Sequence, residues 1–397
     1  MLLLPLANLG SALPTRSLAA PSLRFGRHQL SDRDLADRDL VLCPTLGCMT
    51  PLRPGKVEGH LAKCPVLLEQ RAREESGYYR CGANSGADEV DSSEEPPAVL
   101  TPDVAAELEA RIREAHAATL GSQLMHTSVG LAPAPAEAEI TAKRERERER
   151  HRQQRHVIAE QLAALGVLGH GHCLIELGAG NGELSLAVAE AYPEAVASDA
   201  LILLDRSAKP KGKGKGSRLA ADPALATHFG SVSRVKLGIE DVDLGGLRDQ
   251  LAPGRRLVVF AKHLCGAATD YALRAVAAAC DSRAADGGPV AVVLGSCCHH
   301  RCTWAAYPAR RWLSGSCRLT SGADFALLCR LSSRGTDAAD ASARADAGRR
   351  AKDLLDEGRR RFLREACGFD EARLVTYVDG GVTPENVLVV GAFGSVK

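Results

Sequence analysis

The segment of the chain with the clearest chemical use is residues 173–182, which read CLIELGAGNG. Its apolar start predicts a buried strand, and its end contains three alternating glycines, Gly178, Gly180 and Gly182. The run of good helix formers at 183–192 predicts a helix directly after the turn. Glycine lets the backbone approach a ligand closely, and a helix N-terminus offers free N–H groups, so this strand, turn and helix predict a ligand-binding site.

The spacing of the glycines decides which class of ligand to expect. The nicotinamide and flavin fingerprint is G-x-G-x-x-G, and here Glu183 stands where that fingerprint has its third glycine. The pattern that begins at Glu176 is instead Glu-x-Gly-x-Gly-x-Gly, which is common in S-adenosylmethionine-dependent methyltransferases. Asp205 ends the next apolar run, where an acid would bind the ribose hydroxyls of the cofactor. We therefore expect these residues to bind S-adenosylmethionine; a glycine turn without a ligand is the alternative.

Strand and helix patterns alternate from residue 150 onward, which predicts an open sheet covered by helices on both faces. The expected fold is α/β and Rossmann-like, with a mainly parallel sheet of the class I methyltransferase type. A final strand at 385–390 is expected to run antiparallel at the end of the sheet. Ligands in such sheets bind beyond the carboxyl ends of the strands, so the polar residues at those ends are the active-site candidates.

Polar residues follow the predicted third, fourth and fifth strands. Glu240 follows the third strand, where an acid could contact the adenine of the cofactor. Lys262 and His263 directly follow the fourth strand, expected at 257–261. His299 lies in the segment CCHHRC after the fifth strand. A metal site is one interpretation of that segment, but adjacent residues seldom point to one centre, so polar walls of a substrate pocket are preferred.

Near the N-terminus, four potential metal ligands lie close together in the sequence: Cys43, Cys48, His60 and Cys64. The first two sit on a turn that contains proline and glycine, and the last two are four residues apart, on one face of a predicted helix. This arrangement predicts a closed tetrahedral Cys3His site for structural zinc. The segment is too short to form an apolar core, so the metal would supply its folding free energy. Four unrelated side chains are the alternative.

Composition limits the function classes. With 397 residues, 45% of them hydrophobic, the chain can bury one large core and carry smaller attachments. The net charge of +1 excludes a global field that attracts nucleic acid, so such binding must use local basic patches. No run of 18 apolar residues is present, so we expect no membrane-spanning helix. Thirteen cysteines, several in metal-like clusters, favour a reducing compartment over a disulfide framework.

Four parts are expected along the chain: a leader at 1–38, the zinc finger at 39–68, a linker and helix at 69–140, and the methyltransferase domain at 141–397. The leader lacks acids up to residue 31 and is either an organelle transit peptide or a disordered or misassigned start. Residues 79–100 are polar and acidic, as linkers are. The methyltransferase domain is expected to contain a low-complexity insertion at 333–349, followed by a helix at 350–367.

Two basic segments are candidates for contact with RNA phosphates. Residues 143–156 read KRERERERHRQQRH, and alternating Arg and Glu is equally consistent with a solvated helix held by ion pairs. Residues 209–218 read KPKGKGKGSR, a flexible loop that either touches RNA or is simply an insertion.

Several segments together resemble one enzyme family: KHLCGAATDYALR, VVLGSCCHHRCTW, FALLCRLSS, AKDLLDEGRRRFLREACGF and VTPENVLVV. They resemble the eukaryotic tRNA ribose 2′-O-methyltransferases that modify the fourth nucleotide of the acceptor stem, over about residues 40–70 and 150–395. The resemblance implies a CHHC-type zinc finger, in which Cys48 replaces a histidine, and tRNA as the partner in cytoplasm or nucleus. The usual third-strand acid is replaced by Gly238, so adenine recognition falls to Glu240, Asp241 or the backbone.

The implied chemistry is the transfer of a methyl group to a ribose hydroxyl, for which alignment and loss of the hydroxyl proton matter most. A protonated Lys262 would stabilise the developing alkoxide, and a neutral His263 would take the proton, with His299 as the next candidate. A purely structural role for His263 is the alternative. Two other functions remain open: a non-catalytic RNA-binding protein with a degenerate methyltransferase fold, and a methyltransferase for protein or small molecules. No obligate protein partner is evident from the sequence.

Overall fold

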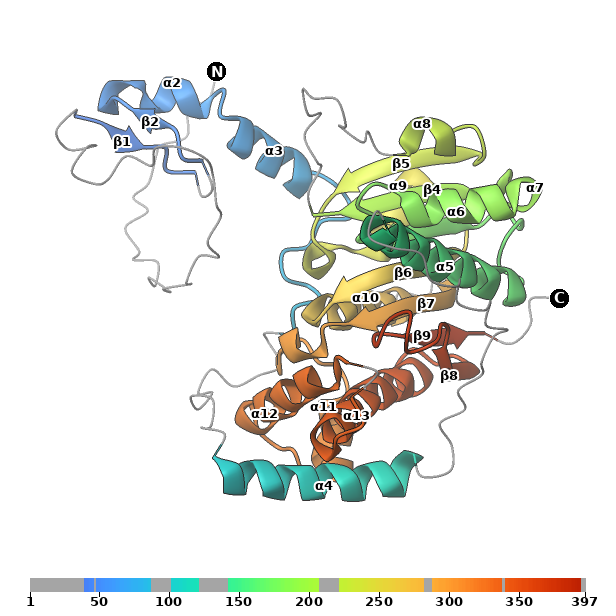
Figure 1. Cartoon of the computed structure of the whole chain (residues 1–397). Helices are drawn as coiled ribbons and strands as arrows, with labels where there is room; N and C mark the ends of the chain where they lie inside the picture. Colours follow the sequence, from blue (N-terminus) through green and yellow to red (C-terminus); the bar gives the residue numbers. More distant parts are fainter. Residues whose placement is uncertain are drawn as a thin grey trace. The chain divides into compact units, whose positions relative to one another are not determined.

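The computed structural model describes residues 39–45, 48–86, 101–120, 142–206, 221–281, 288–337 and 340–393. The chain divides into two compact units, one ending at Ala72 and one beginning at Arg73 (Figure 1). The predicted leader at 1–38 and the basic loop at 209–218 lie outside the described residues, as do positions 87–100 of the predicted linker. Among the described residues, no helix combines the length and the apolar character that crossing a bilayer requires.

The smaller unit is a short hairpin followed by helical turns. Its elements are β1 (Val41–Leu42), β2 (Pro51–Leu52), the 3-10 turn η1 (Pro54–Lys56), α2 (Val57–Leu61) and the start of α3 (Pro65–Glu74), with β1 and β2 antiparallel. The prediction of one helix carrying both His60 and Cys64 is wrong, because α2 ends at Leu61 and Cys64 lies between the two helices. Pro65 explains this break, since the residue before a proline disfavours the helical conformation.

The larger unit is built on a seven-stranded sheet of order β5-β4-β3-β6-β7-β9-β8. Its strands are β3 (Cys173–Leu177), β4 (Ala200–Asp205), β5 (Ser231–Lys236), β6 (Leu257–Cys265), β7 (Pro289–Cys297), β8 (Glu371–Thr376) and β9 (Val387–Ala392). The five strands from β3 to β7 are parallel, and β9 runs antiparallel to both β7 and β8. The mixed α/β class with a mostly parallel sheet is thus confirmed. The last strand is antiparallel as predicted, but β8, which the sequence did not reveal, forms the edge beyond it.

Helices cover both faces of the sheet, as Figure 1 shows. The helices of the larger unit are α4 (Pro102–Leu120), α5 (Ala142–Ala164), α6 (Glu183–Ala191), α7 (Pro193–Val196), α8 (Asp222–Leu225), α9 (Leu244–Leu251), α10 (Ala267–Asp281), α11 (Arg310–Cys317), α12 (Gly322–Ser332) and α13 (Ala343–Glu365), with 3-10 turns η3 (Ile239–Asp241), η4 (His299–Arg301) and η5 (Ser333–Gly335). Residues of α5 and α6 share one core with alternate residues of the strands, and residues of α9, α10 and α13 share the other. All five residues of β3 are therefore buried, which explains its unbroken apolar start.

A third core lies beyond the sheet, where α4 packs on α11, α12 and α13 through Leu108, Ile112 and Ala115. We had expected a linker and a helix at 69–140, outside the methyltransferase domain. The apolar face of α4 is buried in the larger unit instead, because apolar residues at helical spacing need a partner surface.

Residues 79–86, which we expected to be linker, also pack on the larger unit. The Asn84 side chain is 2% exposed and donates to the carbonyl oxygens of Ile239 and Val242, at 2.8 Å each. Tyr79 forms a β-bridge with Val242. The polar composition suggested that this segment is solvated, but the hydrogen bonds of the Asn84 side chain satisfy the buried polar groups.

The segment 333–349, expected to be a low-complexity insertion, contributes to the core. The helix expected to start at residue 350 starts at Ala343, with the Ser342 side chain accepting a hydrogen bond from the Ala345 N–H at its N-terminus. Ala345 and Ala347 are buried. Small residues at these positions allow close packing, so low complexity here reflects a tight helix contact.

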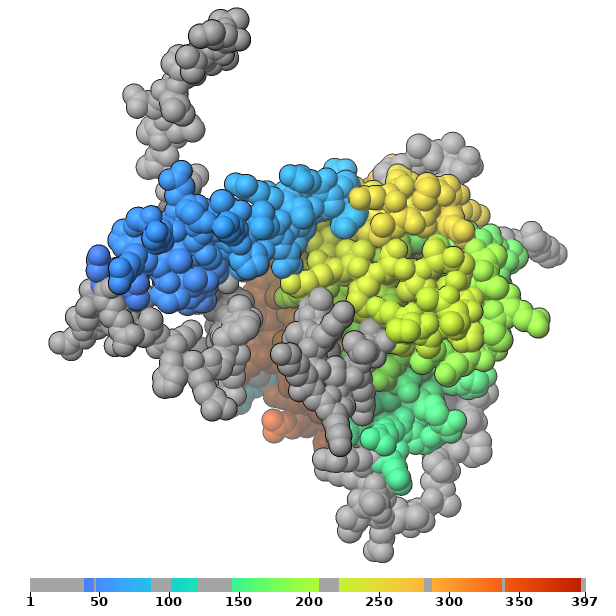
Figure 2. Space-filling view, turned by 90° about the horizontal axis from the view of Figure 1, so that it is seen from above, coloured from blue at the N-terminus to red at the C-terminus, as the bar shows by residue number. Residues whose placement is uncertain are grey.

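Figure 2 shows the surface of the larger unit at the β5 edge, where yellow-green segments form a continuous face.

Candidate functional site

The glycine turn after β3 has the backbone conformation that its sequence predicts. The φ angles of Gly178, Gly180 and Gly182 are +64°, +52° and +78°, in the left-handed region that favours glycine. Gly180 N–H donates to Asp205 Oδ2 at 2.8 Å, which joins the turn to the end of β4. A side chain at Gly180 would meet nothing within 4 Å, so this part of the turn faces open space. The turn can therefore admit a ligand close to its backbone.

Glu176, near the end of β3, stabilises the turn through hydrogen bonds to α6. Its side chain is 4% exposed, and Oε2 accepts hydrogen bonds from the backbone N–H and the hydroxyl of Ser185 on α6. Burial raises the pKa of Glu176 to about 7, against the opposing effect of these two bonds. This carboxylate holds the start of α6 against the end of β3.

A cavity of about 220 Å³ lies over the turn. It is lined by residues of β3, α5, α6, β6 and the turn after β3: Arg155, Glu176, Gly178, Ala179, Asn181, Glu183, Leu184, Lys262 and His263. The structure therefore brings Glu176 and Gly178 together with Lys262 and His263, although more than 80 residues separate the two pairs in the sequence. Gly180, Gly182, Asp205 and Glu240 lie outside this lining.

Lys262 and His263 belong to a bulge in β6, not to a loop after it. We had expected this strand to end at Ala261, but it continues to Cys265, and its register with β7 shifts between Ala261 and Leu264. A β-bulge adds one residue and redirects the side chains around it. Gly295 on β7 makes room for the bulge, since a Cβ there would lie 2.2 Å from the carbonyl oxygen of Lys262.

Lys262 is a partly buried cation that contacts helix α5. Its Nζ donates to His151 Nδ1 at 2.8 Å. Burial and the nearby charge of Arg155 lower the pKa of Lys262 to about 8. At neutral pH the ammonium form still predominates, but the proton is held less firmly than on an exposed lysine.

His263 stands beside this cation at the mouth of the cavity. Its ring lies edge-on to the ring of His151, with centroids 6.0 Å apart. Loss of hydration and then the charge of Lys262 lower the pKa of His263 to about 4, although the residue is exposed. The ring is therefore neutral at physiological pH and has an unprotonated nitrogen, although a pKa this low makes it a weak base.

Glu240 occupies the space that a side chain at Gly238 would need. A Cβ built on Gly238 would lie 2.6 Å from the Glu240 carboxyl group. Glu240 also forms an ion pair with Arg206, which directly follows Asp205. The Glu240 carboxyl group thus lies where a side chain at position 238 would begin.

His299 lies in a different cavity from Lys262 and His263. This second cavity, of about 490 Å³, is lined by residues of β7, η4, α13, the end of β8, and the start of β9 with the segment before it: Ser296, His299, Arg349, Lys352, Asp353, Asp356, Thr376, Pro384, Glu385, Asn386 and Val387. His299 is 2% exposed; its Nε2 contacts Asp356 Oδ2 at 3.0 Å, and its Nδ1 lies 3.4 Å from Glu385 Oε2. The imidazole is held between two carboxylates.

This charged environment makes His299 a cation. Burial alone would lower its pKa, but the charge and the hydrogen bond of Asp356 raise it to about 9. Burial likewise works against the Asp356 carboxylate, yet His299 and Arg359 lower its pKa to about 2. Arg359 is fully buried and also pairs with Asp270 at 2.9 Å. A protonated His299 cannot serve as a base near neutral pH.

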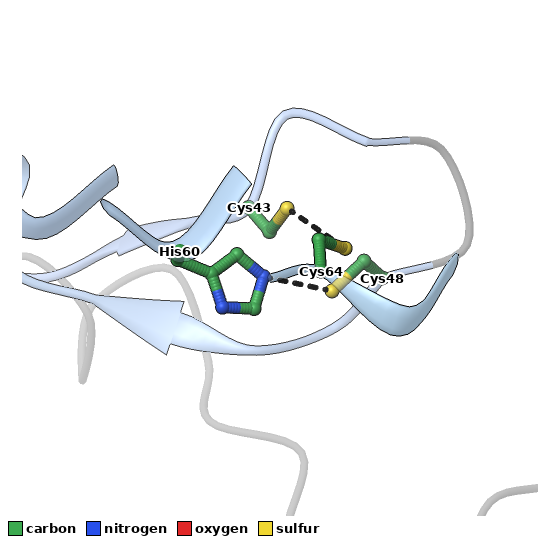
Figure 3. A group of neighbouring side chains, drawn as sticks. All are labelled: Cys43, Cys48, His60 and Cys64. Atoms are coloured by element: carbon green, nitrogen blue, oxygen red, sulfur yellow. Dashed lines mark hydrogen bonds between the residues drawn. The ribbon is translucent and has the colours of Figure 1, made fainter. Parts of the chain in front are cut away.

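The four N-terminal ligand candidates converge in space (Figure 3). The ligand atoms of Cys43, Cys48, His60 and Cys64 all lie within 4.8 Å of one another. Cys43 Sγ and Cys64 Sγ are 3.9 Å apart, and Cys48 Sγ lies 3.5 Å from His60 Nε2. The three cysteines are the only buried residues among the described positions up to residue 72. This group could hold a metal ion, and a metal would replace the apolar core that the unit lacks.

Sequence reasoning missed how far α5 contributes to the cavity. His151 and Arg155 come from the basic run at 143–156, which we had considered for phosphate contact or solvation. Arg155 instead pairs with Glu183 at the start of α6, at 2.7 Å, and Arg152 pairs with Glu149 on its own helix. The available signal was the loss of alternation after residue 150, where histidine and arginine replace the regular Arg-Glu repeat.

Comparison with protein families matches residues 153–343 and 336–392 to the model described as Methyltransferase TRM13. Together the two ranges cover more than half of the chain.

Curated proteins with the same designation are similar over variable lengths. The "tRNA:m(4)X modification enzyme TRM13" of Yarrowia lipolytica is 26% identical over an alignment 406 residues long. The alignment covers 92% of this chain and 84% of that protein. The protein of the same name from Scheffersomyces stipitis is 30% identical over 183 residues, covering 40% of this chain and 43% of its own length. The mouse "tRNA:m(4)X modification enzyme TRM13 homolog" is 27% identical over 338 residues, covering 75% of this chain and 66% of the mouse protein.

Proposed function

Because the chain belongs to the TRM13 methyltransferase family, we propose that it is a tRNA methyltransferase that uses S-adenosylmethionine to methylate the ribose 2′-oxygen of nucleotide 4 in the acceptor stem. The names of its relatives support tRNA as the substrate. A Rossmann-like class I methyltransferase fold is part of this proposal and is supported by the mostly parallel sheet. Such a protein would work in the cytoplasm or nucleus.

One observation carries the proposal: a single cavity joins the glycine turn after β3 to a lysine and a histidine from β6. The turn is suited to a cofactor, and the lysine and histidine are suited to a hydroxyl that must lose a proton. Methyl transfer needs both groups within reach of one another.

The residues around the turn fit S-adenosylmethionine. Open space at Gly180 leaves room for a ligand against the backbone, and Asp205 lies at the end of β4, where a carboxylate can accept from ribose hydroxyls. Glu240 offers a second carboxylate near Gly238 for the adenine. The cofactor supplies an electrophilic methyl group when bound.

Within the cavity, Lys262 and His263 would act on the 2′-hydroxyl in complementary ways. His263, neutral at physiological pH, would accept the hydroxyl proton at a ring nitrogen. Lys262, still mostly protonated, would stabilise the negative charge that develops on the oxygen. His151 orients the Lys262 ammonium through their hydrogen bond. His299 is better suited to binding than to proton removal, because it is already protonated.

The second cavity supports a role for this sheet edge in RNA binding. Ser296 is the last residue but one of β7, Thr376 ends β8 and Val387 begins the antiparallel β9, so this cavity lies at the same edge of the sheet as the first. Arg349 lines it and is a cation of the kind that holds phosphates. A-form RNA displays its 2′-hydroxyls along a shallow minor groove, which an enzyme can approach without opening base pairs.

We also propose that the N-terminal group binds structural zinc through Cys43, Cys48, His60 and Cys64. Three thiolates and one imidazole form a donor set typical of structural zinc. The lack of other buried residues among the described positions of this unit supports a folding role for the ion.

A direct test is methyl transfer to tRNA followed by location of the methyl group. The purified full-length chain is incubated with labelled S-adenosylmethionine and unmodified tRNA, and the RNA is then hydrolysed with alkali. Alkaline cleavage uses the 2′-oxygen as nucleophile, so 2′-O-methylation leaves one resistant dinucleotide, whose mass and position are read by mass spectrometry. We expect that dinucleotide at position 4; label released in single nucleotides would show base methylation and refute the ribose assignment.

Variants distinguish catalysis from mere binding. His263→Asn should lower the rate by about 10²-fold or more, as loss of a general base does, while cofactor affinity measured with S-adenosylhomocysteine stays within a few-fold. His228→Asn, outside both cavities, serves as the matched control. If the wild-type chain binds no S-adenosylhomocysteine in calorimetry but still binds tRNA, the non-catalytic RNA-binding alternative is correct.

A further inference from the structure

A second group of sulfur ligands lies at the ends of β6 and β7. The Sγ atoms of Cys265, Cys297 and Cys298 all lie within 4.8 Å of one another, and those of Cys265 and Cys297 are 3.4 Å apart. None of the three lines either cavity. Among the described residues, the only other group of three or more metal-ligating side chains this close together is the N-terminal one.

The sheet topology explains why two of these thiols meet. Cys265 and Cys297 are register partners on neighbouring parallel strands, so their side chains project from the same face of the sheet. The Gly266 N–H donates to the Cys297 carbonyl oxygen at 3.0 Å and holds the two strand ends together. These sulfurs are therefore placed by the rigid part of the fold.

The third thiol reaches the group through an uncommon backbone conformation. A residue that continued β7 would point its side chain to the opposite face from Cys297. Cys298 instead adopts φ 50° and ψ 44°, the left-handed conformation, which is unfavourable for residues other than glycine. This turn brings Cys298 Sγ back toward Cys265. Sequence reasoning discounted a metal here because adjacent residues seldom share a centre, and it did not foresee this turn or the contribution from β6.

The distances suit a shared ion. Zinc–sulfur bonds of about 2.3 Å in a tetrahedral site place two sulfurs about 3.8 Å apart. A disulfide needs about 2.05 Å, so the observed separations leave room for an ion between the thiols. Burial differs among the ligands: Cys297 is 5% exposed, whereas Cys265 is open to solvent. An ion here would be bound by the buried Cys297 on its inner side and would be accessible to solvent on its outer side.

We propose that Cys265, Cys297 and Cys298 form a three-thiolate site for a soft divalent cation such as Zn²⁺, with its fourth coordination position open to solvent. Binding releases up to three thiol protons to the buffer, forms three metal–sulfur bonds and changes no oxidation state. Thiolates select soft ions over Mg²⁺ and Ca²⁺. The ion would fix the ends of β6 and β7 two and three residues from His263 and Lys262, and the proposal stands independently of the reaction that these residues perform.

Cadmium titration of the reduced, chelator-stripped full-length chain tests the proposal. Cd²⁺ is the probe, because its thiolate complexes absorb in the ultraviolet and it binds the same donors as zinc. We expect two Cd²⁺ ions per chain by native mass spectrometry. Cys265→Ser and Cys298→Ser should each weaken the binding of one ion at least 100-fold, while Cys81→Ser, which removes an exposed thiol outside both groups, should leave both ions bound.

Alkylation of the thiols locates the second ion. In the metal-free chain iodoacetamide should label Cys265, and bound Cd²⁺ should slow that labelling at least tenfold while Cys81 reacts at an unchanged rate. Intact tryptophan fluorescence confirms that each variant is folded. The proposal is wrong if Cys265→Ser and Cys298→Ser bind as many ions as the wild type with unchanged affinity, if Cd²⁺ leaves the labelling of Cys265 unchanged, or if the isolated chain is lighter by two hydrogens and carries a Cys265–Cys297 disulfide.

Discussion

Replacement of Lys262 by methionine should stabilise the protein and lower its activity at least 10²-fold. The wild-type chain keeps a cation in a partly buried place, and its pKa falls from an ordinary 10.5 to about 8. That difference corresponds to about 3 kcal/mol of destabilisation at pH 7, at 1.36 kcal/mol per pKa unit. Methionine has a similar length and no charge, so Lys262→Met removes this cost. It also removes the hydrogen bond to His151, worth about 1 kcal/mol, which leaves an expected gain of about 2 kcal/mol.

The pH dependence of this gain identifies its origin. The folded chain binds its Lys262 proton less tightly than the unfolded chain, so wild-type stability rises with pH between about 8 and 10.5, and the cost is full below pH 8. The advantage of Lys262→Met should therefore shrink by about 2 kcal/mol between pH 7 and pH 10. Urea unfolding measures this difference in the free energy of unfolding. The signal is the fluorescence of Trp304 and Trp312, which are the only tryptophans of the chain and both lie in the larger unit.

A matched variant has the opposite expected sign. Lys352 is also buried, but its Nζ bonds the Gly335 carbonyl oxygen and Glu385, at 2.7 Å each. Lys352→Met breaks a buried pair and should cost about 3–5 kcal/mol. Methyl transfer by Lys262→Met should fall at least 10²-fold, because no cation then faces the developing alkoxide. A Lys262→Met protein that is less stable than wild type at pH 7 would refute the inference that the buried charge of Lys262 costs stability. A variant that keeps full activity would refute its role in methyl transfer.

Three further outcomes are expected. Asp205→Asn removes a carboxylate from the end of β4 and should weaken S-adenosylhomocysteine binding by about 10–100-fold in calorimetry, at about 1.4 kcal/mol per tenfold; unchanged affinity would remove it from the cofactor site. Gly295→Ala forces a Cβ against the Lys262 carbonyl and should cost about 1–3 kcal/mol and most of the activity, whereas Gly315→Ala, with nothing within 4 Å, should be neutral or slightly stabilising in urea. Cys48→Ser, or a zinc chelator, should expose the unit up to residue 72 to protease while tryptophan-detected unfolding of the larger unit stays the same; protection without metal would contradict the zinc proposal.

The parts of the fold that followed from the sequence are those with strong local patterns. The strand, glycine turn and helix at 173–192 form as expected, because apolar residues, positive-φ glycines and helix formers each favour one conformation without tertiary help. The five parallel strands also occur close to their predicted places, although β6 continues past Ala261 to Cys265. The edge strand β8 was missed, since Glu371–Thr376 has few of the apolar residues that mark a buried strand. The packed segment at 79–86 was missed because its polar groups are satisfied by partners about 155 residues away.

For the site, the sequence by itself determined the residue types and the edge of the sheet at which they lie. Carboxyl ends of parallel strands must share one edge, which placed the glycine turn, Lys262 and His299 on the same side of the sheet. Only the tertiary structure decided which of them share a cavity. The bulge in β6 turns Lys262 toward the glycine turn, while Asp356 on α13 draws His299 into the second cavity. Such choices depend on side chains from distant helices, and their distances and charges exist only after the chain has folded.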